Sequence, residues 1–214
     1  KTLQKDGIKV VALVHALFTF NPQLQALVRS VDGIIVHSPE NRLEAIANGA
    51  EPEKVFIVPH GVDTRPHVSE ERRMKIRAEL GISPGDKIAV TFGFVQPHKG
   101  VEGLLEGVIH LNNLGIPCTG IIAGKPHQDD VEGIPYQNEL KRIAKDAGIE
   151  KKEIFLDRFL TEDEVTEYLG LADIVLLNYK SKYYEASGAC SLALGAGATV
   201  VTSIAPPFLP FHDA

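Results

Sequence analysis

The sequence predicts an α/β protein of two domains, each built on an open parallel sheet. Short apolar runs rich in β-branched residues alternate with stretches of helical spacing along nearly the whole chain. Strands that alternate with helices imply right-handed crossovers and a parallel sheet covered on both faces. The alternation lapses over the polar segment VDTRPHVS, residues 62–69, which is therefore the predicted linker.

The first domain, predicted to span residues 1–65, alternates three apolar runs with two helical stretches. The runs IKVVALVH, GIIVHS and KVFIVPHG are short and β-branched, as buried strands are. Asn21 is the expected N-cap of the first helix, with Pro22 at its first position, and Gly49 stops the second helix. Strands are therefore expected at 8–15, 33–38 and 54–61, and helices at 21–32 and 39–49.

The second domain, predicted to span residues 66–214, opens with the charged amphipathic helix EERRMKIRAELG. Thr161, with Glu164 three positions later, predicts a capping box. The chain begins at Lys1 in the approach to a strand and ends at FLPFHDA without a closing helix, so we expect a fragment of a longer protein. Strands are expected at 86–94, 117–124, 151–159, 173–179 and 198–203, and helices at 70–81, 101–115, 136–148, 161–172 and 187–197.

Composition narrows the class of protein. The net charge is −6 and no basic run is present, which argues against nucleic acid as a partner. Cys118 and Cys190 lie far apart in apolar settings, so we expect buried free thiols in a reducing cytosol. No apolar run reaches the length that spans a bilayer, and no signal peptide is recognisable, so a cytoplasmic protein is expected.

The loop FGFVQPHKG, residues 92–100, is the first candidate site. Ligands of open parallel sheets bind beyond the carboxyl ends of the strands, where this loop lies. Gly93 lets the backbone approach a ligand, and Lys99 stands at a helix start where it could meet a phosphate as a point charge. The alternative is a glycine turn with a solvated lysine. The spacing is not that of a P-loop.

The stretch YYEASGACSLALGAG, residues 183–197, is the second candidate. Glu185 follows a strand, and Ser187 and Gly188 stand where a helix begins, so bare N–H groups can face an anion. The carboxylate could then accept hydrogen bonds from sugar hydroxyls. Alternatively, Glu185 and Ser187 merely cap the helix.

Three further segments hold weaker candidates. His15 ends the first strand and could donate to a ligand hydroxyl or phosphate, although a lone histidine is more often structural. VPHGVD is expected to be an ordered hinge, with His60 packing or capping. The loop around Arg158 and Phe159 could offer backbone groups to a nucleobase, or be explained by the capping box alone. No metal-ligand spacing and no Ser–His–Asp order is present.

In this order, these motifs resemble the retaining nucleotide-sugar glycosyltransferases of the GT-B fold, known as family 4 or group 1. VHSPENRLEAIANGAEPEKVFIVPHGVD is similar to the end of that family's N-terminal domain, and TFGFVQPHKGVEGLLEGV to the opening of its C-terminal domain. FLDRFLTEDEVTEYLGLADIVLLNY resembles the run leading to the donor site, and YYEASGACSLALGAGATVVTS the E-x7-E region. The likeness covers nearly the whole chain and implies two Rossmann-like domains, the N-terminal one incomplete.

The resemblance also implies a role for each matching residue. Lys99 would bind the donor diphosphate together with the helix start at Ser187 and Gly188. Glu185 would touch the donor sugar, and His15 would lie near that sugar from the N-terminal side. The catalytic residues would thus be His15 and Glu185, and the donor-binding residues Gly93, Lys99, Arg158, Phe159, Ser187 and Gly188. Family members need no metal, and no cofactor is expected beyond the nucleotide-sugar substrate.

Three departures from the family pattern stand out. The second Glu of E-x7-E falls at Ala193, as in a subset of the family with S-G-x-x-x-L-A, and the usual arginine falls at Phe94. The glycine-rich first loop of the N-terminal domain is absent. The predicted function is sugar transfer from a nucleoside-diphosphate sugar to a glycan, lipid-linked or small-molecule acceptor with retention. The alternative is a non-catalytic nucleotide- or glycan-binding domain, and peripheral membrane contact through the absent half-domain stays open.

Overall fold

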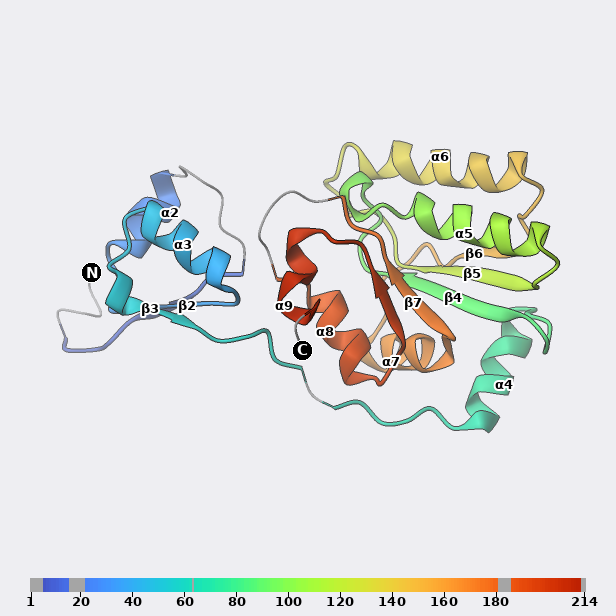
Figure 1. Cartoon of the computed structure of the whole chain (residues 1–214), viewed down its shortest axis with the longest axis horizontal. Coiled ribbons are helices and arrows are strands. Elements are labelled where there is room, and N and C mark those ends of the chain that lie inside the picture. The colour runs from blue at the N-terminus through green and yellow to red at the C-terminus, as the bar shows by residue number, and fades with distance from the viewer. Residues whose placement is uncertain (1–5, 16–21, 63, 181–185, 213–214) are drawn as a thin grey trace. The chain divides into compact units, whose positions relative to one another are not determined.

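The structure, a computed structural model, describes residues 6–15, 22–62, 64–180 and 186–212 (Figure 1). The chain divides into two compact units. Unit 1 comprises residues 1–61, 182–188 and 204–214, and unit 2 comprises residues 62–181 and 189–203. Both units are α/β, and every strand pairing within them is parallel.

Unit 1 contains a three-stranded sheet in the order β1-β2-β3. Val11 pairs with Gly33, and Ile34 pairs with Val55. Apolar residues of the helices, among them Val28 and Ala45, pack against buried side chains of β2 and β3. The elements are β1 (Val11–Leu13), α2 (Pro22–Val28), β2 (Gly33–Val36), α3 (Pro39–Ala47), η1 (Pro52–Lys54) and β3 (Val55–Ile57), followed near the end of the chain by η3 (Pro206–Phe208) and α9 (Leu209–His212).

Unit 2 contains a five-stranded sheet in the order β6-β5-β4-β7-β8. The strand order reverses beside β4, because the chain moves outward through β5 and β6 and then returns to the other side of β4 with β7. The elements are α4 (Glu70–Glu79), β4 (Lys87–Phe92), η2 (Pro97–Lys99), α5 (Glu102–Asn113), β5 (Cys118–Ala123), α6 (Gly133–Asp146), β6 (Glu153–Phe155), α7 (Glu162–Leu171), β7 (Ile174–Leu177), α8 (Gly188–Gly195) and β8 (Val200–Thr202).

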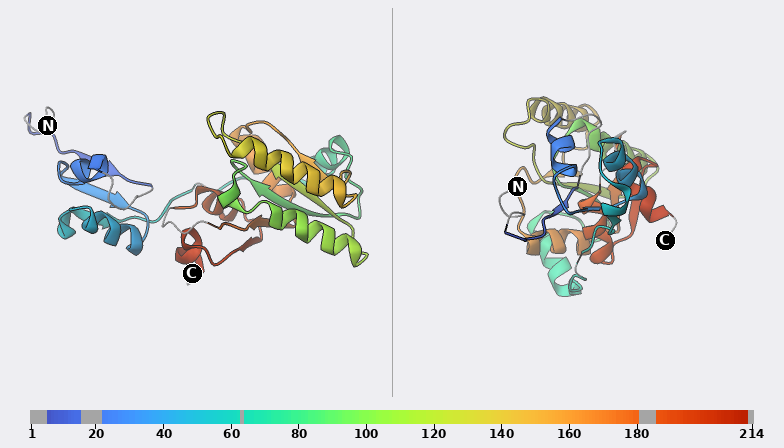
Figure 2. Two further views of the ribbon diagram at one scale, coloured as in Figure 1. Left: turned by 90° about the horizontal axis from the view of Figure 1, so that it is seen from above. Right: turned by 90° about the vertical axis from the view of Figure 1, so that its left-hand side faces the viewer.

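Helices cover both faces of the sheet of unit 2. On one face, α5 and α6 pack over alternate residues of β4 and β5, including Ala89 and Ile122 (Figure 1, Figure 2). On the other face, α4 and α7 pack over the intervening residues, including Ile88, Val90 and Ile121. Because side chains alternate along a strand, burial on both faces explains why these strands are apolar almost throughout.

The predicted fold class is confirmed, and each predicted strand and helix has a counterpart in the structure. The capping box at Thr161 and Glu164 forms as expected, and both cysteines are free and buried. Near the end of the chain, Pro206 opens the 3-10 turn η3, which leads into the four-residue helix α9, and the expectation that the closing helices are missing stays a prediction. α2 begins at Pro22 as predicted, whereas the expected N-cap Asn21 lies outside the described residues.

The predicted linker is attached to unit 2 in its second half. The Arg65 backbone N–H donates to the Gly195 carbonyl at 2.9 Å, and its guanidinium donates to the Glu162 carbonyl and to the Thr166 hydroxyl. The linker prediction depends on polarity and on the lapse of the apolar pattern, and neither property distinguishes a free segment from one that is hydrogen-bonded to a domain surface. The domain limits at 65 and 66 stay a prediction.

None of the helices in the described ranges is both long enough and apolar enough to cross a bilayer.

Candidate functional site

The carboxyl ends of β4 and β7 form the point where the strand order of unit 2 reverses. At such a point the loops after two neighbouring strands diverge to opposite faces of the sheet, which leaves a crevice where ligands of open α/β sheets bind. The loop after β4 is the predicted phosphate loop, residues 93–100. The loop after β7 begins at Asn178 and precedes the second predicted motif in the sequence.

Glycines allow close packing of the backbone around the loop after β4. Gly93 has φ +111°, a conformation that L side chains rarely adopt, and the space where a Cβ would stand is open. A Cβ on Gly124 would overlap the Gly93 carbonyl oxygen, and one on Gly100 would overlap the Asn178 carbonyl oxygen. The loop is thus held closely on both sides while its backbone at Gly93 stays accessible.

Lys99 lies at this reversal point. Its ammonium nitrogen is 4.0 Å from the ring centroid of Tyr179, the second residue after β7. Tyr179 is buried, and its carbonyl oxygen accepts a hydrogen bond from the Ser203 hydroxyl at 2.7 Å. A cation over an aromatic face is attracted by the ring quadrupole. The structure therefore places the predicted phosphate-binding cation between the loops that follow β4 and β7.

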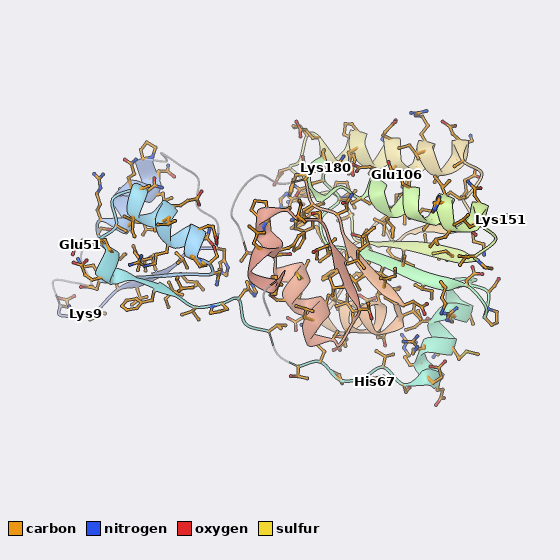
Figure 3. All side chains as sticks on the ribbon, in the orientation of Figure 1. Lys9, Glu51, His67, Glu106, Lys151 and Lys180 are labelled. Atoms are coloured by element: carbon orange, nitrogen blue, oxygen red, sulfur yellow. The ribbon has the colours of Figure 1, made fainter. Side chains whose placement is uncertain are left out.

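A second set of contacts ties these two loops together. The Lys180 backbone N–H donates to the His98 carbonyl at 2.8 Å, and the Lys180 ammonium pairs with the Glu102 carboxylate at the start of α5. The Tyr136 hydroxyl of α6 donates to the other Glu102 oxygen. Figure 3 labels Lys180 close to the beginning of α5. Sequence reasoning missed this network, because Glu102 alone suggests only a carboxylate favoured by the helix dipole.

The charges in this network are balanced. Burial by itself would raise the pKa of Glu102, but hydrogen bonds from Lys180 and Tyr136 outweigh it and lower that pKa. Burial, followed by the hydrogen bond to Glu102, raises the pKa of Tyr136. Glu102 is therefore an anion and Tyr136 a neutral donor at neutral pH, so the Lys180 charge is neutralised locally by Glu102.

An aromatic hollow of about 150 Å³ lies beside the loop, beyond β4, β5 and β6. The Phe94 and Phe159 rings form an edge-to-face pair with centroids 5.8 Å apart, and the Lys125 ammonium is 4.4 Å from the Phe159 centroid. Arg158 also lines the hollow. Edge-to-face rings bordered by cations can pack against the apolar faces of a flat, polar ring.

Arg158 is fixed by Glu164 of α7. Its two terminal nitrogens donate to the two carboxylate oxygens at 2.9 and 2.6 Å. These hydrogen bonds, together with one from the Thr161 backbone N–H, lower the pKa of Glu164 to about 2. The capping box therefore positions Arg158 as well as starting α7, and contact of this segment with a nucleobase stays a prediction.

The remaining predicted site residues belong to unit 1. His15 follows β1, and its Nδ1 lies 2.9 Å from Nε2 of His37. Ser187 is buried and Gly188 is the first residue of α8. His37, His60 and Ser187 line a hollow of about 200 Å³ in this unit. Glu185 lies outside the described residues, and the predicted partnership of Lys99 with the α8 start, which would join two units, stays a prediction.

Among the residues that the structure describes, no group of three His, Cys, Asp or Glu side chains is arranged to hold a metal ion. Three imidazoles do lie close together after β1, β2 and β3, but both ring nitrogens of His37 are already engaged in hydrogen bonds.

The sequence model of the glycosyl transferases group 1 matches residues 72–208, which is more than half of the chain. The chain belongs to this family. The match begins in α4 and ends in η3, so it spans the whole sheet of unit 2 and both loops at the reversal point. The family resemblance expected from the order of motifs is confirmed.

Curated relatives agree with the family assignment at low identity. A D-inositol 3-phosphate glycosyltransferase of Mycobacterium sp. (strain KMS) is 27% identical over 187 residues, and that of Streptomyces bingchenggensis is 25% identical over 195 residues. Each alignment covers 87% of this chain but 40% of the relative. The chain therefore spans about two fifths of the length of these relatives.

Solved structures show the same fold. Anabaena Alr3699/HepE in complex with UDP superposes with a TM-score of 0.80 at 19% identity, covering 97% of this chain and 57% of that one. Trehalose-6-phosphate synthase OtsA superposes with a TM-score of 0.70 at 13% identity, covering 99% and 56%. At these identities the likeness shows the fold, which is the predicted GT-B type.

Two departures from the group 1 pattern now have a structural setting. Ala193, where the second Glu of E-x7-E would fall, is fully buried in α8. Phe94, where the family's arginine would fall, packs against Phe159 and lies 5.3 Å from the His127 ring. In this chain Phe94, which lines the aromatic hollow, thus stands at the sequence position where the family has a second phosphate-binding cation.

Proposed function

We propose that the complete protein is a retaining, metal-independent glycosyltransferase that moves a sugar from a nucleoside-diphosphate sugar to a glycan, lipid-linked or small-molecule acceptor. One observation carries the proposal: in a group 1 domain, the Lys99 ammonium is held over Tyr179 where the strand order reverses. A fixed cation at that place can neutralise charge on a leaving diphosphate as the glycosidic bond breaks. Such preorganised electrostatic stabilisation needs no metal ion.

The other residues would act around this cation. The Phe94 and Phe159 hollow would take the nucleobase, with Arg158 fixed beside it by Glu164. The N–H groups at the start of α8, near Gly188, would face the phosphates, and Glu185 and His15 would contact the donor sugar. Alr3699/HepE has been solved with UDP and with UDP-glucose, which supports a uridine nucleotide as the first donor class to test.

A second function, non-catalytic binding of a nucleotide or glycan, is favoured by two observations. Phe94 supplies no charge to a diphosphate, and buried Ala193 supplies no hydrogen-bond acceptor to a ribose. A domain with these changes could retain a ligand without turning it over. Turnover of a nucleotide sugar by the full-length protein would exclude this second function.

Calorimetric titration of the chain with UDP-, GDP- and ADP-sugars tests donor binding. We expect Lys99→Ala to weaken binding of the preferred donor about tenfold or more, since a charged hydrogen bond contributes about 1.5–3 kcal/mol. Lys87→Ala is the matched control, because Lys87 opens β4 at the opposite end of the sheet and pairs with Asp173 at 3.3 Å. Equal affinity of Lys99→Ala and wild type would refute the assigned site.

The acceptor class and the cytoplasmic location belong to the same proposal. Acceptor choice would depend mainly on the part of the N-terminal domain that lies outside this chain, as would any peripheral contact with a membrane.

A further inference from the structure

Three histidines gather at one edge of the sheet of unit 1. His15, His37 and His60 each follow a strand, β1, β2 and β3, so parallel strand direction brings them to the same edge. The His15 and His37 ring centroids are 4.7 Å apart, and those of His37 and His60 are 5.1 Å apart. Of these, the function proposed above uses only His15.

Hydrogen bonds order two of the three rings into a chain. Nδ1 of His37 lies 2.9 Å from the Val58 carbonyl oxygen, and Nε2 of His37 lies 2.9 Å from Nδ1 of His15. A carbonyl oxygen can only accept, so Nδ1 of His37 must carry a hydrogen. A neutral imidazole carries one N–H, so Nε2 of neutral His37 is an acceptor and Nδ1 of His15 must be the donor.

The tautomer of His15 follows from this chain. With its hydrogen on Nδ1, neutral His15 has a bare Nε2 that accepts hydrogen bonds and cannot donate them. Burial lowers the pKa of His15, and a positive charge on His37 or His60 would lower it further, so the neutral form of the His15 ring is favoured. The residue His37 is 9% exposed, and both of its ring nitrogens are hydrogen-bonded to protein partners.

We propose that His37 is a positioning residue that fixes His15 in the Nδ1–H tautomer, so that His15 offers an acceptor to ligand hydroxyl groups and no donor to phosphate oxygens. This inference rests on the proposed function only for the identity of the ligand. It revises the sequence-based expectation that His15 donates to a hydroxyl or a phosphate. A His15 ring of this tautomer favours hydroxyl groups over phosphate oxygens, because its Nε2 and a phosphate oxygen are both acceptors and would face each other with their lone pairs.

The tautomer can be measured without any ligand. Long-range ¹H–¹⁵N correlation spectra of the ¹⁵N-labelled chain at pH 8, where imidazoles are neutral, report which ring nitrogen carries hydrogen. We expect His15 and His37 each to show a single Nδ1–H form. His15 as an Nε2–H tautomer in the wild-type chain would overturn the inference.

Two substitutions of His37 separate positioning from simple packing. His37→Phe keeps an aromatic ring but removes both hydrogen bonds, so His15 should become a mixture of tautomers. His37→Gln keeps one donor for the Val58 carbonyl and one acceptor for His15, so the Nδ1–H form should be restored. His60→Phe is the control, because it changes the neighbouring ring and leaves the chain of hydrogen bonds intact. An unchanged His15 tautomer in folded His37→Phe would refute the positioning role.

Binding of UDP and UDP-glucose then tests the consequence for the ligand, since the two differ by a hexosyl group that carries hydroxyls. We expect His37→Phe to reduce the preference for UDP-glucose over UDP about 2- to 10-fold, the effect of one hydrogen bond, with His37→Gln restoring it. Equal weakening of both ligands by His37→Phe would contradict hydroxyl recognition. Failure of the wild-type chain to bind any nucleotide sugar would count against the proposed function, while the tautomer spectra would still decide the role of His37.

Discussion

Glu153 predicts an unusual dependence of stability on pH. It opens β6, is 5% exposed, and neither carboxylate oxygen has a hydrogen-bond partner among the described residues. The carboxyl group lies against the backbone of Gly120 in the neighbouring strand, where a Cβ would overlap it. Burial raises the pKa of Glu153 to about 8 from an ordinary value of 4.5.

The sign follows from proton linkage. Between pH 4.5 and about 8 the folded chain holds a proton that the unfolded chain releases, so the unfolded state is favoured as pH rises. The stabilising contribution of protonated Glu153 to the folded state is fully present below pH 4.5 and is lost progressively up to about pH 8. The free energy of unfolding should fall by about 1.4 kcal/mol for each pH unit in this interval, on the order of 5 kcal/mol in total.

Glu153→Gln should abolish this slope, because an amide of the same shape cannot ionise. Urea unfolding of the wild-type chain and the variant from pH 5 to pH 8.5 measures it, with the variant becoming more stable relative to wild type as pH rises. Glu106→Gln is the control, since Glu106 lies exposed on α5 (Figure 3). Parallel pH profiles of wild type and Glu153→Gln would refute the argument.

Two further predictions concern stability alone. Gly124→Ala should destabilise unit 2 by about 3 kcal/mol, because its Cβ would overlap the Gly93 carbonyl, whereas Gly107→Ala, in open space within α5, should stabilise it by about 0.5–1 kcal/mol. Equal thermal shifts for the two variants would contradict the close approach at Gly124. Thr161→Ala should lower the free energy of unfolding by about 1 kcal/mol, because it removes the cap of α7. Glu164→Gln should lower it by less, because glutamine keeps a side-chain acceptor for the Thr161 N–H. If chemical denaturation ranks the two variants the other way, the ion pair of Glu164 with Arg158 contributes more to stability than the cap.

The network around Glu102 anchors the start of the loop after β7. Lys180 is hydrogen-bonded through its backbone N–H to His98 and paired through its ammonium with Glu102. Tyr179 is therefore fixed on one side by Lys180 and on the other by the hydrogen bond from the Ser203 hydroxyl to its own carbonyl oxygen. A substitution at Glu102 is therefore expected to change the position of the Lys99 ammonium through the Tyr179 ring. The site cation is positioned by residues that do not themselves face the crevice.

The sequence alone determined the order and type of the elements. Alternation of β-branched runs with helical spacing is a local property, so the strands, the capping box at Thr161 and the loop with Gly93 and Lys99 could be predicted from neighbouring residues. Parallel topology followed from the alternation, because a right-handed crossover is nearly obligatory. The family resemblance added the candidate roles of Lys99 and His15.

Tertiary structure decided the partners of these residues. The contact of Lys99 with Tyr179 joins positions 80 residues apart in sequence, and the hydrogen bond of His15 with His37 depends on the register of β1 against β2. The absence of hydrogen-bond partners for the Glu153 carboxyl oxygens among the described residues likewise follows from which strand packs beside β6. Spacing along the chain does not encode such distances, since hydrogen bonds and ring contacts form only when separate strands are brought together by burial of their apolar side chains.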